Sequence, residues 1–137
     1  MSKTLGISQL DKQTIPLDRL DREVTESCAA GDYVLAERLL NNAIRQAEDY
    51  GKLDPRLPFA IHSLAALYCT QRRYQDAERL YWQGLVTREK ILGPDHPDVA
   101  DSLERLAVIL RETKGKNEAM YVAFRAQTLA SHRKAKV

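Results

Sequence analysis

The residues with the clearest chemical potential in this sequence are two cysteines and a histidine. Cys28 and Cys69 are 41 positions apart, and His62 lies seven positions before Cys69. Thiolate and imidazole groups are ligands that zinc prefers in proteins, so these side chains could form part of a metal site. A structural zinc site needs four ligands, commonly including a closely spaced pair, and the sequence offers neither. We therefore expect no metal and no cofactor.

A cysteine beside a histidine could also act as a nucleophile, provided that a third group orients the base. The sequence marks no such group. It contains no glycine-rich phosphate loop, no nucleophile elbow and no paired carboxylates in an apolar setting. His96 belongs to a proline-rich loop and is expected to be a turn residue near the start of a helix. No catalytic residue is predicted, and an enzyme is kept only as a third hypothesis.

The composition is that of a soluble globular protein. The chain has 137 residues, of which 44% are hydrophobic and 29% charged, with a net charge of +2. No apolar run approaches the roughly 18–20 residues that cross a bilayer, and no signal peptide is evident. We therefore expect a cytoplasmic protein with reduced thiols, without membrane insertion. The basic C-terminal end is too short to indicate nucleic-acid binding.

Apolar residues recur at helical spacing in six stretches, and the stretches repeat. Leu64 and Leu106 are 42 positions apart, as are Ala77 and Ala119. This constant period predicts a stacked array of helix pairs. We expect an all-α helical solenoid of about three antiparallel pairs, with repeats at about 16–53, 54–95 and 96–132. Residues 1–15 would form a tail or short cap, and 133–137 a basic tail.

The residue types at the repeated positions suit close helix packing. Small residues are needed where paired helices approach most closely, and Ala65 with Ala77, and Ala107 with Ala119, occupy those places. Tyrosines at 68, 74 and 81 are expected to fill the space between neighbouring pairs. No pair can bury its apolar faces alone, so each depends on its neighbours.

The middle repeat resembles the tetratricopeptide repeat, in the long-period variant typical of kinesin light chains and many bacterial proteins. The resemblance rests on three segments: Leu64-Ala65-x-x-Tyr68, Tyr74-x-x-Ala77-Glu78-x-x-Tyr81, and Leu92-Gly93-Pro94-Asp95-His96-Pro97-Asp98-Val99-Ala100. The third repeat follows the pattern through Leu110, and the first follows it only in its second helix. The resemblance covers residues 17–130 and implies a non-catalytic protein–protein interaction scaffold or adaptor.

Members of this family generally bind peptide segments in a concave groove lined by the first helix of each pair. Carrying those positions over implies a partner-binding groove made of Asp18, Asp21, Thr25, Cys28, Phe59, His62, Ala66, Cys69, Thr70, Asp101, Glu104, Val108, Arg111 and Glu112. Kinesin-light-chain-like repeats usually carry two asparagines before the Leu-Ala pair. This chain has His62-Ser63 and Glu104-Arg105 there, which puts the usual way of clamping a peptide backbone in doubt.

The implied groove has an apolar patch around Phe59 and Ala66 between two acidic edges. It is expected to take a protein or peptide segment with a hydrophobic anchor and basic flanks. The alternative is that these acidic residues merely solvate an unused surface.

The last predicted helix offers a second surface. Solenoids normally end in a polar capping helix, but Met120, Tyr121, Phe124 and Leu129 place apolar groups on this one. The sequence therefore also predicts, as an alternative function, a structural or assembly subunit that self-associates into a homo-oligomer through this helix.

Overall fold

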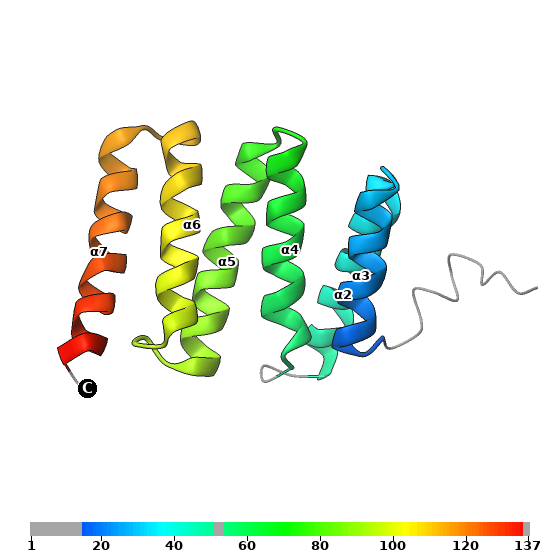
Figure 1. Ribbon diagram of the computed structural model, residues 1–137, viewed down its shortest axis with the longest axis horizontal. Coiled ribbons are helices and arrows are strands. Elements are labelled where there is room, and N and C mark those ends of the chain that lie inside the picture. The colour runs from blue at the N-terminus through cyan, green and yellow to red at the C-terminus, as the bar shows by residue number, and fades with distance from the viewer. Residues whose placement is uncertain (1–14, 51–53, 136–137) are drawn as a thin grey trace, which may run out of the picture. The chain divides into compact units, whose positions relative to one another are not determined.

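The computed structural model describes residues 15–50 and 54–135, and every regular element in these ranges is an α-helix. The six helices confirm the expected all-α fold (Figure 1). Two helices begin in each of the ranges 16–53, 54–95 and 96–132, and the division into three repeats remains a prediction. Most of the predicted N-terminal tail and the last two residues lie outside the described ranges.

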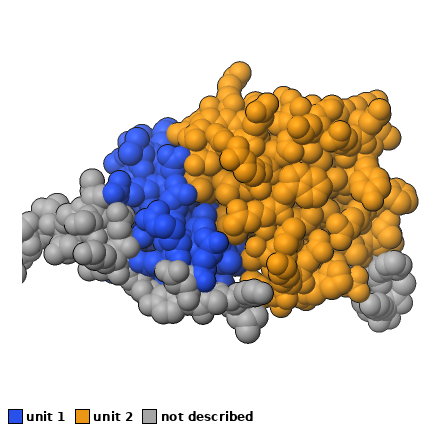
Figure 2. Space-filling model, turned by 180° about the vertical axis from the view of Figure 1, so that it is seen from behind, with its two compact units in different colours: residues 1–60 blue, residues 61–137 orange. Residues whose placement is uncertain are grey.

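The chain forms two compact units, Met1–Ala60 and Ile61–Val137 (Figure 2). Unit 1 contains α2 (Leu17–Ala29), α3 (Tyr33–Tyr50) and the first turns of α4 (Arg56–Thr70). Pro16 precedes α2, as its missing N–H allows. Gly31 then takes a positive φ of 78° in the turn, and Asp32 caps α3 by accepting a hydrogen bond from the Leu35 amide at 3.1 Å.

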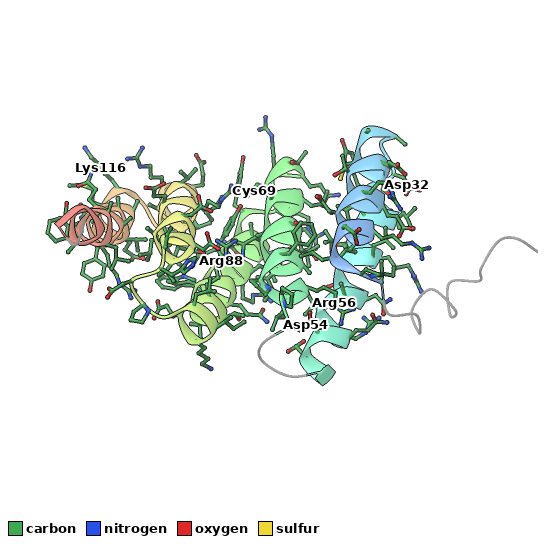
Figure 3. All side chains as sticks on the ribbon, turned by 60° about the horizontal axis from the view of Figure 1, so that its bottom comes forward. Asp32, Asp54, Arg56, Cys69, Arg88 and Lys116 are labelled. Atoms are coloured by element: carbon green, nitrogen blue, oxygen red, sulfur yellow. The ribbon has the colours of Figure 1, made fainter. Side chains whose placement is uncertain are left out.

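A charged pair opens α4 in unit 1. Arg56 is 6% exposed, and its Nε lies 3.1 Å from both carboxylate oxygens of Asp54. Asp54 also accepts from the Arg56 amide at 2.9 Å, which makes it the cap of this helix. The Arg56 Nη1 donates to the Ile15 carbonyl at 3.3 Å. Figure 3 shows the two side chains together at the start of α4.

Unit 2 contains the rest of α4, α5 (Tyr74–Leu92), α6 (Pro97–Thr113) and α7 (Lys116–Ala135). α7 continues through three residues that the sequence assigned to a C-terminal tail. The four alanines predicted at the closest helix approaches are all buried in one core. That core consists of Ala65, Ala77, Tyr81, Leu85, Val99, Leu103, Leu106, Ala107, Ile109, Leu110, Ala119, Val122 and Ala126. Tyr68 and Tyr74 pack against it, partly buried.

The turns of unit 2 follow helix-capping chemistry. After α4, the backbone amide of Arg72 donates to the Cys69 carbonyl at 3.0 Å and that of Arg73 to the Tyr68 carbonyl at 2.8 Å. These are the paired hydrogen bonds of a Schellman motif. Arg72 takes a positive φ of 61°, in a position that usually carries glycine. His96 caps α6 as its Nδ1 accepts from the Asp98 amide at 3.0 Å, so it is a turn residue as expected.

Candidate functional site

Tyr81 of α5 joins the two helices that carry most of the predicted groove in unit 2. Its side chain is buried in the core, and it interacts electrostatically with the Cys69 thiol of α4 and the Arg105 guanidinium of α6. Burial raises the pKa of Tyr81, reinforced by Cys69 and opposed by the charge of Arg105. Burial also raises the pKa of the Cys69 thiol, against a lowering contact with Tyr81. Cys69 is therefore a protonated packing residue and a poor nucleophile.

Arg105 is held in place by its neighbour one turn earlier. Its Nε lies 3.1 Å from Asp101 Oδ2. Burial disfavours the charged guanidinium, but the hydrogen bond and charge of Asp101 outweigh this and leave the Arg105 pKa above its usual value. Asp101 also lies 3.6 Å from Arg88 Nη1. The Asp101 carboxylate is therefore already committed to two arginines.

The solvent-exposed residues next to this joint form a surface that we call the α4–α6 face. Val108 is its largest apolar member and is 63% exposed. Glu104 and Glu112 lie one turn before and one turn after Val108, and neither makes an ion pair within the described part of the chain. The face consists of Ala66, Thr70, Glu104, Val108, Arg111 and Glu112, all exposed.

His62, predicted in the groove, is buried at 8% exposure. Its Nε2 lies 2.9 Å from Ser102 Oγ, and its ring meets Tyr81 edge-on, with centroids 6.0 Å apart. The structure places it between α4, α5 and α6 because its imidazole fits over Gly84, where a Cβ would approach His62 Cε1 to 2.4 Å. His62 therefore contributes to helix packing, and we leave it out of the α4–α6 face.

Arg88 completes this polar network. Its Nη1 donates to Ser102 Oγ at 2.9 Å and to the Asp98 carbonyl at 3.0 Å. A guanidinium can only donate, so Ser102 accepts from Arg88 and has its own proton available for His62 Nε2. The labelled Arg88 lies between α5 and α6 in Figure 3. Ser102 is fully buried, so this serine–histidine contact ties three helices together and is closed to a substrate.

The remaining predicted groove residues lie in unit 1. Asp18, Asp21 and Thr25 are exposed on α2, whereas Cys28 and Phe59 are partly buried. Each unit is described by itself, so the candidate site is built from unit 2 alone.

Of the four residues predicted for self-association, Met120, Tyr121 and Phe124 are 54%, 75% and 70% exposed on α7. Leu129 differs, because it packs partly buried against the core of unit 2.

Sequence reasoning missed three parts of this arrangement. It assigned Tyr81 to the stacking core without its contacts to Cys69 and Arg105, and it did not place Arg105 in the site. The available signal was that Glu104-Arg105 replaces the asparagine pair of the family. It could not identify Arg88 as the partner of Ser102, because the two belong to different predicted repeats.

The described residues give no sign of a metal centre or a membrane span. Among them no group of three or more His, Cys, Asp or Glu side chains could hold a metal ion. Cys28 and Cys69 are both free thiols. None of the described helices is long and apolar enough to cross a bilayer.

Comparison with known proteins identifies the repeat. Residues 60–98 match the family model described as the tetratricopeptide repeat. No curated protein sequence matches the chain closely enough to count as a relative. A crystal structure of putative kinesin light chain nearly identical TPR-like repeats from Podosopora anserina superposes with a TM-score of 0.73 at 21% identity. The match covers 94% of this chain and 64% of the other, so this chain spans less than two thirds of that protein.

At this identity the structural likeness concerns the fold alone, which is that of a TPR-like helical solenoid. The segment 60–98 is therefore similar to the tetratricopeptide repeat, and the helices of the chain are arranged as in a TPR-like solenoid.

Proposed function

We propose that this protein is a non-catalytic adaptor that binds an extended segment of a partner protein on the α4–α6 face. The observation that carries the proposal is that Tyr81 of α5 interacts with Cys69 of α4 and with Arg105 of α6, so one buried side chain links the two helices that carry the face. A reducing, cytoplasm-like compartment is part of the proposal, because both cysteines are free thiols.

The chemistry of the face favours a particular kind of segment. Val108 is an exposed apolar residue between the free carboxylates of Glu104 and Glu112. A segment with one apolar anchor and basic residues on either side would cover Val108 and pair with both glutamates. Arg111 is the one cation among the residues of the face, and it limits how many basic residues the segment can place there.

Labelled peptides with a central leucine test this directly. Fluorescence anisotropy should show tighter binding when lysines flank the leucine than when glutamates do. Glu104→Gln and Glu112→Gln should each weaken binding of the lysine peptide by about 0.2–1 kcal/mol, the range for exposed ion pairs. Asp101 is a poorer choice for mutation because it already holds Arg105.

Val108→Asp should weaken binding of every peptide in the set. Val86→Asp is the matched control, since Val86 is an exposed valine (47%) on α5, outside the face. Equal binding of the lysine-flanked and glutamate-flanked peptides would refute the proposed charge preference. An unchanged affinity in Val108→Asp would refute binding on this face.

A second candidate function is self-association through α7. Met120, Tyr121 and Phe124 expose more than half of their surface on one helix, and contiguous exposed apolar surface of this kind marks interaction sites. In this reading the chain is a structural or assembly subunit. Its test is argued at the end of the Discussion.

A further inference from the structure

A shallow apolar hollow lies among α5, α6 and α7 in unit 2, and none of the residues of the α4–α6 face lines it. Its volume is about 300 Å³, at the lower end of the range for sites that hold small ligands. We call it the aromatic hollow. It is lined by Trp82, Leu110, Asn117, Glu118, Tyr121 and Val122.

Two aromatic rings of the aromatic hollow remain available to a ligand. Trp82 is 41% exposed and Tyr121 is 75% exposed, whereas Leu110 and Val122 are buried and form an apolar floor. The face of an aromatic ring carries negative electrostatic potential, and tryptophan and tyrosine attract cations within about 6 Å of the ring centroid. Helix packing in the core does not account for this much exposed aromatic surface.

The hollow also contains an acidic side chain. Glu118 precedes Tyr121 by three positions, so both project from the same side of α7. It makes no ion pair or hydrogen bond with any residue that the structure describes. By contrast, Glu89 on α5 is held by Arg125 at 3.2 Å. An aromatic pair together with a free carboxylate suits a cation better than a neutral apolar group.

We propose that the aromatic hollow binds a lysine side chain of a partner protein. The aliphatic stem of the lysine lies over Leu110 and Val122, as long charged side chains commonly cover apolar surface. Its ammonium group meets the rings of Trp82 and Tyr121 and the carboxylate of Glu118. This contact shares no residue with the α4–α6 face and adds a second point of attachment to unit 2.

The experiment uses Trp82, the only tryptophan in the chain, as its own reporter. Its fluorescence is followed while the full chain is titrated with acetyl-Gly-Lys-Gly-amide, or with the same peptide carrying norleucine, at constant ionic strength. The lysine peptide should change the signal in a saturable way and bind about two- to fivefold more tightly than the norleucine peptide, the range for an exposed cation–π contact. Equal or tighter binding of norleucine overturns the proposal, as does a signal that never saturates.

Variants on α7 locate the site. Tyr121→Ala and Glu118→Gln should each weaken binding of the lysine peptide by about two- to fivefold. Phe124→Ala removes an equally exposed aromatic that does not line the hollow, and it should leave binding unchanged. Loss of binding in Phe124→Ala, without loss in Tyr121→Ala, would overturn the assignment. Circular dichroism of each variant confirms that the helices remain folded.

Discussion

The His62 ring packs directly over Gly84, so a larger side chain at position 84 would clash with it. An alanine at position 84 would place its Cβ 2.4 Å from His62 Cε1, and the hydrogen bond between His62 Nε2 and Ser102 Oγ holds the ring in place. In an exposed helix, replacing glycine with alanine stabilises by about 0.5–1 kcal/mol. Here we predict that Gly84→Ala instead destabilises the protein by about 1–3 kcal/mol, the usual effect of overpacking. Urea unfolding measures the change.

A double-mutant cycle with His62→Ala separates the clash from other effects of the substitution. In a His62→Ala background the imidazole is gone, so Gly84→Ala should become neutral or stabilising. Gly31→Ala is not a suitable control, because its positive φ adds backbone strain. If Gly84→Ala has the same effect with and without His62, the two residues are not coupled and the packing argument fails.

At the scale of the elements, a charged pair stabilises the start of α4. Asp54 caps the helix and pairs with buried Arg56. This hydrogen bond to Arg56 lowers the pKa of Asp54 below 3.8, although burial opposes it. A carboxyl whose pKa is lower in the folded state stabilises the fold fully above its unfolded pKa, and that contribution is lost as the pH falls through the folded pKa.

Asp54→Ala should therefore destabilise the protein by about 1–3 kcal/mol at neutral pH, because it removes the carboxylate that caps α4 and accepts hydrogen bonds from the buried Arg56 guanidinium. The difference in unfolding free energy between the wild type and Asp54→Ala should shrink as the pH falls below about 3.8. Denaturant unfolding across the acid range measures this difference. Asp18→Ala, which removes an exposed carboxylate on α2, is the control. A difference that stays constant down to the lowest pH would show that the Asp54 charge is not responsible.

The helices could be predicted from the sequence because their signals are local. The alanines at 65, 77, 107 and 119 recur with the repeat, and the structure buries all four. The turn after α4 carries no glycine signal, because Arg72 adopts a left-handed conformation that its residue type does not favour.

The polar contacts of the site could not be predicted in the same way. His62 meets Ser102 forty positions later, and Arg88 reaches the same hydroxyl from α5. Such contacts depend on side-chain direction across three helices, and periodicity does not specify it. The family pattern placed His62 in the groove because asparagines usually occupy that position. A glycine at 84 opens the space in which this larger ring is buried.

At the scale of the whole molecule, Tyr121 belongs to two proposed interactions that compete. It lines the aromatic hollow, and it is one of three exposed apolar residues on α7. If a second copy covers α7, a lysine side chain loses access to the hollow. Self-association should therefore weaken binding of the lysine peptide at high protein concentration.

Self-association itself is predicted to depend on Phe124, which is 70% exposed beside Tyr121. Phe124→Glu places a charge where two copies would meet, and an unpaired charge in an interface is strongly unfavourable. Light scattering at two widely separated concentrations should show the mass of the wild type rising with concentration while Phe124→Glu remains monomeric. Val86→Glu adds the same charge at an exposed site on α5 and should behave like the wild type. A wild type that is monomeric at both concentrations would exclude the oligomeric subunit and leave α7 free for a different partner.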